Sequence, residues 1–196
     1  MDYILIGAGI VVLVIVVYLI TWVISTYNRL INLRMNADRQ SSHVEVHLKK
    51  KFDMIPALVN VVKGYAKHES GTFEEVTRLR SQWAASKDNI QKVRTANMLE
   101  SALSKLLVIQ ERYPRLKADR NFIRLQDSIS HVENELVHER KVYNKRISWY
   151  NVKLQMFPSS LIAKLFGFEE KPFFQLGNGE SSVGETFGPE DEGDLN

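Results

Sequence analysis

The sequence predicts an all-α protein in which a single N-terminal transmembrane helix continues into an antiparallel bundle of three or four long helices, followed by a disordered acidic tail. Three observations support this prediction. A stretch near the N-terminus is almost wholly apolar, apolar residues recur every three or four positions through most of the remaining chain, and residues 177–196 hold six acidic side chains and no basic one. We expect four segments, at residues 1–26 (anchor), 27–157 (cytoplasmic bundle), 158–176 (a Phe-rich segment) and 177–196 (tail).

The composition argues against several classes of enzyme. The chain has 196 residues, of which 26 are Lys or Arg, 23 are Asp or Glu and none is Cys. Without Cys there can be no disulfide, thiolate metal site or cysteine nucleophile. The glycine-rich nucleotide-binding motifs, the serine-hydrolase elbow and the paired-histidine motif of zinc proteases are also missing from the sequence. We therefore expect a non-enzymatic protein with no catalytic residue and no cofactor.

The first helix is predicted to cross the cell membrane. Ile4–Ile24 forms a stretch of 21 residues, which as a helix is roughly 31 Å long and matches the ~30 Å hydrocarbon layer. A cleaved signal peptide fits less well, because the residues before the apolar stretch include Asp2 and no base, and no small-residue cleavage site follows the stretch. Basic residues follow the span and do not precede it, so the N-terminus is expected outside and the bundle in the cytoplasm.

The apolar pattern then predicts the helices of the bundle. The first continues past the membrane, with a kink expected near residue 52 because Pro56 lacks a backbone donor. Thr72 and Glu75 have the spacing of a capping box and predict the start of the next helix. A third long helix is predicted over Ala118–Met156, where an almost strict heptad of apolar residues is interrupted only at 139–140.

The number of helices is open at one position. If Thr72–Arg112 is one helix, the bundle has three helices and the last of them ends far from the membrane. If the chain reverses at Ser86–Asn89, where the apolar pattern thins, there are four helices and the last ends near the membrane. The weak break contains no Gly or Pro, so the sequence leaves both arrangements open.

The Phe-rich segment after the last long helix has three interpretations. It is expected to form a short helix near Ser159–Phe166. It could cover the open end of the bundle, lie on the membrane surface as an amphipathic anchor, or form a groove for a partner. The membrane interpretation requires the four-helix arrangement. The candidate contact residues are Leu161, Ile162, Leu165, Phe166 and Phe168.

A repeated pair of polar residues is the candidate interaction strip. Tyr143-Asn144 recurs seven residues later as Tyr150-Asn151, so both pairs lie on the same faces of the helix. Such residues commonly form buried hydrogen bonds that fix the register of packed helices. The alternative is a surface that binds a partner.

Histidine and glutamate give only weak candidates for a metal site. His43 and His47 are four residues apart, but their spacing with Glu45 is not that of a metalloprotease. His131 and His138 share a face without a third convergent ligand. A di-metal bundle needs Glu-x-x-His on two helices, and only Glu135-x-x-His138 matches. The other acidic side chains that could contribute are Glu100, Glu111, Glu133 and Glu139. We expect no metal.

The basic run Lys49–Lys51 is interpreted as a solvated helix face. Acidic residues interleave the basic ones along the chain and no nucleic-acid-binding motif is present, so no nucleic acid partner is expected.

Six stretches of the chain form a recognisable series. They are YNRLINLR (27–34), LKKKFDMIPALVNVVKGYAKHE (48–69), ERYPRLKADRNFIRLQ (111–126), VENELVHERKVYN (132–144), WYN (149–151) and FPSSLIAKLFGF (157–168). Together, and in this order, they resemble the LemA family as far as residue 176. The resemblance implies one N-terminal span, a cytoplasmic antiparallel bundle usually described as four helices, and no established enzymatic activity. Where the family often has Ala-Trp this chain has Gln40-Ser41, so looser packing of the first helix is expected there.

These observations favour a membrane-anchored scaffold or adaptor of the LemA type that presents interaction surfaces to protein partners at the cytoplasmic face. The alternative is an accessory or regulatory subunit of a membrane enzyme such as a protease, and a metal-binding bundle is less favoured. Association into homo-oligomers is a further expectation, because the apolar stripes of the helices are wide.

Overall fold

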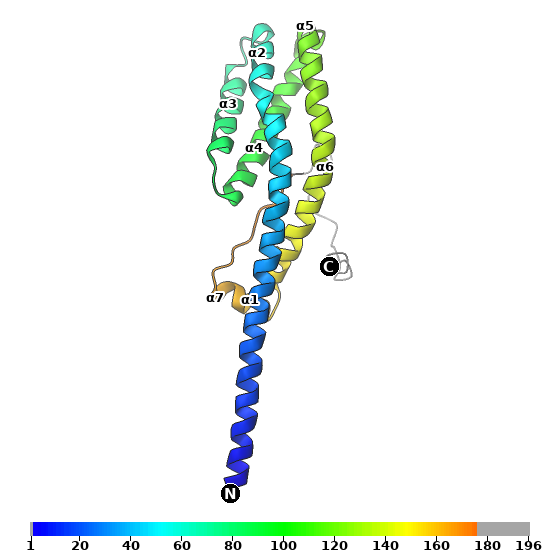
Figure 1. The fold of residues 1–196 in the computed structure, drawn as a ribbon. Coiled ribbons are helices and arrows are strands. Elements are labelled where there is room, and N and C mark those ends of the chain that lie inside the picture. The colour runs from blue at the N-terminus through cyan, green and yellow to red at the C-terminus, as the bar shows by residue number, and fades with distance from the viewer. Residues whose placement is uncertain (1, 176–196) are drawn as a thin grey trace. The chain divides into compact units, whose positions relative to one another are not determined.

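The computed structural model describes residues 2–175, and every regular element in that range is helical (Figure 1). The all-α prediction is therefore confirmed. The predicted disordered tail, residues 177–196, lies outside the described residues. The elements are α1 (Asp2–Asp53), α2 (Ile55–Tyr65), α3 (Ser70–Ala85), α4 (Asn89–Val108), the 3-10 turn η1 (Ile109–Arg112), α5 (Pro114–Lys117), α6 (Arg120–Gln155) and α7 (Ser159–Leu165).

The chain divides into two compact units. Unit 1 comprises Met1–Ala37 and Arg146–Lys171, and unit 2 comprises Asp38–Lys145 and the residues from Pro172 onward. Helices α1 and α6 contribute residues to both units. Unit 1 thus contains the apolar N-terminal helix and α7, whereas unit 2 contains the remaining helices.

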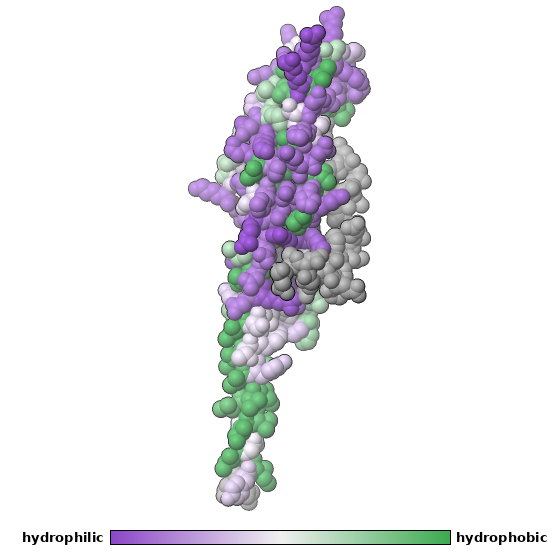
Figure 2. Space-filling model, turned by 45° about the vertical axis from the view of Figure 1, so that its right-hand side comes forward, coloured by the Kyte–Doolittle hydropathy of each residue, from purple (hydrophilic) through white to green (hydrophobic). Residues whose placement is uncertain are grey.

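The N-terminal part of α1 is an apolar helix whose side chains are exposed. Figure 2 shows that most of its surface is hydrophobic. Among the large apolar side chains between Tyr3 and Ile20, the exposed fraction runs from 47% at Val16 to 89% at Tyr3. This part of α1 is long and apolar enough to cross a membrane, as predicted from its length and composition.

The hairpin of α3 and α4 settles the number of long helices in the bundle. Helix α3 ends at Ala85, and Ser86 is extended. The carboxylate of Asp88 then caps α4 by accepting a 2.9 Å hydrogen bond from the backbone N–H of Gln91. Figure 1 shows the two helices side by side and antiparallel. The four-helix alternative is therefore the correct one.

Two predicted helix boundaries have different outcomes. The helix is interrupted close to the kink expected near residue 52, since α1 ends at Asp53 and α2 begins at Ile55, one residue before Pro56. The capping box at Thr72 was a wrong prediction. Helix α3 begins earlier, because the N–H groups of Thr72 and Phe73 both bond to the carbonyl of Glu69, and no side chain caps this end.

Unit 2 has an apolar core that also contains buried polar side chains, among them Gln40. The rings of Phe52 and Trp83 meet edge to face with centroids 4.9 Å apart. Gln40, at the position where looser packing was expected, is buried and donates a 2.6 Å hydrogen bond to Oε2 of Glu139. A hydrogen bond thus joins α1 to α6 at this position. The heptad positions of α6 that are buried in unit 2 are Phe122, Ile129, Val132, Leu136 and Tyr143, and those in the part of α6 that belongs to unit 1 are Ile147, Tyr150 and Leu154.

Unit 1 has its own small core, which forms around the part of α1 that follows the apolar stretch. Leu30 of α1 packs with the end of α6 and with α7. The guanidinium group of Arg146 donates a hydrogen bond from Nη1 to the carbonyl of Asn36 at 3.0 Å. The end of α6 therefore lies beside the part of α1 that directly follows the predicted span. The cluster consists of Leu30, Tyr150, Leu154, Ile162 and Ala163, with Trp22, Val23, Tyr27, Leu33 and Phe168 partly buried against it.

Candidate functional site

The candidate strip on α6 contacts the main chain of the segment Glu169–Gln175, which we call the strap. In unit 2, Asn144 bonds to both main-chain groups of one strap residue. Its Nδ2 donates to the carbonyl of Phe174 at 2.8 Å, and its Oδ1 accepts from the N–H of Phe174 at 3.0 Å. The hydroxyl of Tyr143 donates to the carbonyl of Pro172 at 3.1 Å. These residues thus bind protein main chain in the manner of a neighbouring strand.

A second asparagine, on α4, extends the arrangement in unit 2. Nδ2 of Asn97 donates to the carbonyl of Phe173 at 2.9 Å, and its Oδ1 accepts from the N–H of Gln175 at 3.0 Å. Asn97 was not among the residues selected from the sequence, because a single asparagine on an amphipathic helix carries no pattern. Phe174 is 3% exposed, and its ring lies 4.8 Å from that of Tyr143.

The second half of the strip makes the same contacts within unit 1. Asn151 donates from Nδ2 to the carbonyl of Lys171 at 2.9 Å and accepts from its N–H at 3.0 Å. The hydroxyl of Tyr150 donates to the carbonyl of Glu169 at 3.0 Å. The seven-residue repeat seen in the sequence therefore corresponds to a repeat of main-chain contacts.

Burial controls the ionisation of the strip tyrosine. Removal of Tyr143 from water raises the pKa of its phenol well above the usual range, and the nearby carboxylate of Asp38 raises it further. Tyr143 is therefore a neutral hydrogen-bond donor at physiological pH.

A second polar cluster lies in unit 2, where the apolar heptad of α6 is interrupted. Arg140 donates from Nη1 to Glu133 at 2.8 Å and from Nη2 to Glu100 at 3.1 Å. Lys51 of α1 donates to Glu100 at 2.5 Å and also to Glu133. Lys51 is 4% exposed and Arg140 is 2% exposed. Two cations and two anions thus alternate in a cluster that joins α1, α4 and α6.

This cluster corrects the interpretation of Lys49–Lys51 as a solvated face. Lys49 and Lys50 are exposed, but Lys51 is buried and ion-paired. Glu100 and Glu133, considered above as metal ligands, are instead neutralised by two basic side chains. The interruption at 139–140 was the signal of a buried polar group, but it did not identify the partners.

The pKa of Glu133 is set by opposing effects. Its burial raises the pKa, but the positive charges of Lys51 and Arg140, and the hydrogen bonds from both, lower it by more. The net result is a pKa below the ordinary 4.5 of a glutamic acid. Glu133 is therefore charged across the physiological range.

The histidine candidates do not converge on a metal site. His47 lies 3.1 Å from Oε2 of Glu135, and His131 lies 3.7 Å from the other oxygen of the same carboxylate. Glu45 points to Lys92, with which it pairs at 2.5 Å. Within residues 2–175 no group of three His, Asp or Glu side chains is placed to hold a metal ion.

The Phe-rich segment divides into a packed side and an exposed side within unit 1. Ile162 is buried, and Phe168 and Phe166 meet the ring of Tyr27 with centroids 5.6 and 4.8 Å away. Leu161 and Leu165 point away from the core and are largely exposed. The segment therefore packs one side against α1 and α6 and exposes the other.

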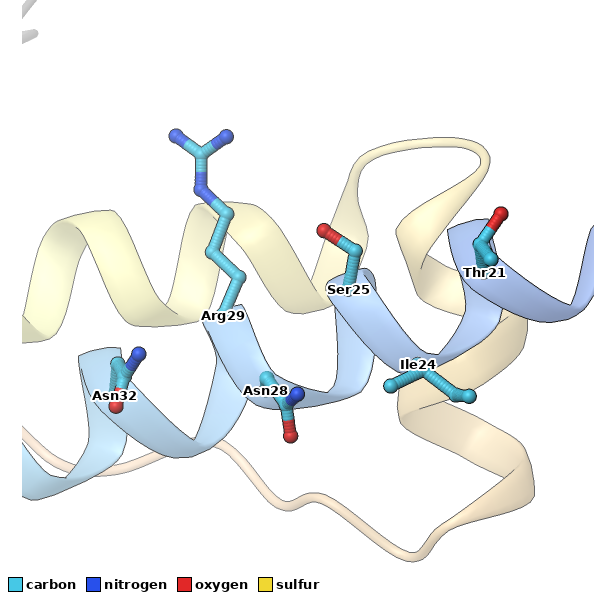
Figure 3. A pocket seen from close by; sticks show the side chains of 6 residues that line it. All are labelled: Thr21, Ile24, Ser25, Asn28, Arg29 and Asn32. Atoms are coloured by element: carbon cyan, nitrogen blue, oxygen red, sulfur yellow. The ribbon is translucent and has the colours of Figure 1, made fainter. Parts of the chain in front are cut away.

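A shallow hollow runs along one side of α1 near the end of the apolar stretch. Figure 3 shows the side chains that line it, all projecting from this single helix. They are Thr21, Ile24, Ser25, Asn28, Arg29 and Asn32. A surface on one helix does not enclose a small molecule, so this hollow is not a candidate active site.

Comparison with known proteins places the chain in a family. Residues 40–185 match the LemA family, which is most of the chain. The chain belongs to the LemA family. It is 23% identical to Protein LemA of Metamycoplasma hominis over 149 residues, covering 76% of this chain and 68% of that protein. It is also 21% identical to the Magnetosome protein MamQ of Magnetospirillum gryphiswaldense over 193 residues, covering 85% of this chain and 70% of that protein. These relationships and the apolar N-terminal helix fit a membrane-associated helical protein.

The charge cluster of this LemA-family chain predicts a large effect of Arg140→Met. The substitution leaves two carboxylates with one cation in a buried site, which should lower the free energy of unfolding by about 3–5 kcal/mol. Thermal and denaturant unfolding of the full chain in detergent, followed by circular dichroism, would measure this. Arg124→Met, at an exposed position of the same helix, is the matched control and should change stability by less than about 0.5 kcal/mol. Equal effects of the two substitutions would contradict a structural role for the cluster.

The lowered pKa of Glu133 predicts a contribution to stability that depends on pH. Because the folded-state pKa lies below 4.5, the contribution is full above 4.5 and is lost as the pH falls through the folded-state pKa. Glu133→Gln should therefore destabilise the chain near neutral pH, and the difference from the wild type should shrink in acid. Glu74→Gln, at an exposed position, should show no such convergence. A difference that stays constant through the acid range would refute this assignment.

Proposed function

We propose that this LemA-family protein is a membrane-anchored, non-enzymatic adaptor that presents protein-binding surfaces at the cytoplasmic face. The observation that carries the proposal is the strip on α6, where Asn144 and Asn151 each pair with both main-chain groups of an extended residue. A carboxamide that donates to a carbonyl and accepts from an N–H matches the chemistry of a peptide. Such an arrangement suits the recognition of protein segments rather than of small molecules.

The exposed apolar side chains of α1 support the proposed anchor. A contiguous apolar surface of this size is unfavourable in water, whereas a helix in lipid satisfies all its backbone hydrogen bonds internally. Arg29, Arg34 and Arg39 follow the span, and Asp2 is the charged side chain that precedes it. The positive-inside tendency therefore favours a cytoplasmic bundle and an external N-terminus.

The exposed side of α7 supports a second contact with the membrane. Trp22 and Tyr27 mark the end of the predicted span and belong to the same small core as Ile162 of α7. The opposite side of α7 presents Leu161 and Leu165 at this level of α1. We propose that these two side chains rest in the lipid interface, where apolar side chains beside a span gain burial.

Cysteine labelling can test the orientation, because the chain has no natural cysteine. We expect Tyr3→Cys to react with a membrane-impermeant maleimide on intact cells of the expression host. Met98→Cys, which is exposed on α4, should react only after lysis. The reverse pattern would show that the bundle lies outside.

The interfacial position of α7 can be tested by fluorescence. Leu165→Cys carrying an environment-sensitive dye should show brighter, blue-shifted emission when the full chain is reconstituted into vesicles. The same dye at Met98→Cys is the control, because its exposed position on α4 should remain in water. Identical spectra at the two positions would refute the proposed contact.

The adaptor role can be tested by cross-linking in intact membranes. A photo-reactive amino acid at Phe173, which is exposed beside the strip, should capture other proteins that mass spectrometry can identify. The same group at the exposed Glu74 of α3 is the matched control and should capture fewer. Recovery of self-links alone would contradict an adaptor and favour a self-assembling protein.

A further inference from the structure

The strap is recognised in unit 2 almost entirely through its main chain. Asn97, Tyr143 and Asn144, which we call the carboxamide site, bond to five main-chain groups between Pro172 and Gln175. These are three carbonyls and two N–H groups. No hydrogen bond from the site to a side chain of this strap segment is present among those described. The contacts therefore do not depend on the identity of most strap residues.

One strap side chain adds selectivity to these contacts. Phe174 is buried against Tyr143, whereas the neighbouring Phe173 and Gln175 are exposed. Side chains alternate in an extended segment, so a site that binds the main chain meets every second side chain. The carboxamide site thus specifies an extended conformation and one aromatic residue.

We propose that the carboxamide site binds extended segments of other proteins that carry a phenylalanine, and that the strap occupies it as a competing ligand from the same chain. This inference rests on the adaptor function proposed above and names the class of partner. The strap then acts as a built-in competitor, which an incoming segment must displace.

The way the strap is held favours exchange. The strap has no helix or strand of its own. A hydrogen bond to main chain gains little net free energy, since water offers equivalent partners, and ordering each extended residue opposes binding. The strap remains bound because its attachment to α7 gives it an effective concentration on the order of millimolar. A partner segment that fits equally well displaces it once the strap is weakened or the partner is itself held nearby.

Peptide binding by the full chain tests this inference directly. The probe is a fluorescent synthetic peptide with the strap sequence EEKPFFQ (169–175), titrated by anisotropy into the detergent-purified chain. The variant Phe174→Ala, which weakens the strap, should bind the probe at least about tenfold more tightly than the wild type does. A probe with alanine at the position of Phe174 should bind this variant at least about tenfold more weakly.

Second substitutions in the Phe174→Ala chain locate the bound peptide. Adding Asn144→Ala should abolish binding, whereas adding Asn60→Ala, at an exposed position of α2, should leave it unchanged. Adding Tyr143→Phe keeps the ring, removes one hydrogen bond and should weaken binding by about two- to tenfold. Because this change is conservative, it keeps the test informative if Asn144→Ala fails to fold.

Three results would overturn the inference. The first is that the wild type and Phe174→Ala bind the probe with equal affinity. The second is that Phe174→Ala binds the two probes with equal affinity. The third is that none of the substitutions in the carboxamide site weakens binding of the probe. A concentration-dependent dimer of the wild type that Phe174→Ala abolishes would also overturn it, since the occupant would then be a second copy.

The outcome is separable from that of the adaptor proposal. If Asn144→Ala does not change which partners are cross-linked, the protein is still an adaptor but binds its partners through a surface other than the carboxamide site. If the protein binds the probe specifically but cross-links only to itself, the carboxamide site is a peptide-binding site and the proposed adaptor function is wrong.

Discussion

The capped turn between α3 and α4 is the constraint on which the four-helix arrangement depends. Because α3 ends at Ala85 and Asp88 caps α4, this part of the chain forms two antiparallel helices and not one. Within unit 2, Asn97 of α4 and Asn144 of α6 then bond to the same strap. Within unit 1, Tyr150 and Leu154 near the end of α6 pack with Leu30 of α1 and Ile162 of α7.

The buried charges in unit 2 have a different physical consequence. Apolar side chains at the same positions would pack the bundle equally well or better, since removal of charges from water is costly. The alternating arrangement of Lys51, Glu100, Arg140 and Glu133 requires one particular register of three helices, because a shift of one turn would leave a buried charge unpaired. The cluster therefore restricts how the helices can pair more than it strengthens their association. That restriction also positions the asparagine of α4 relative to the strip on α6.

The strip on α6 unites the two interpretations that the sequence left open. Tyr143 and Asn144 do form partly buried hydrogen bonds, as expected of structural residues, but they form them to an extended segment and not to another helix. A helix face that already binds main chain has the chemistry needed to bind the main chain of another protein. A structural role in the resting protein and a role in binding partners are therefore compatible at the same residues.

Local patterns in the sequence were sufficient to determine the helical class, the apolar N-terminal helix, the buried heptad of α6 and the repeat of Tyr-Asn pairs. Each of these depends on residues within a few turns of one another, where periodicity alone specifies which face is buried. The tertiary structure alone decided the number of helices, the partners of Lys51 and Arg140, the participation of Asn97 and the identity of the segment bound by the strip. Those features depend on groups distant in the chain, and a local pattern shows that a side chain needs a partner without showing which residue the fold brings to it.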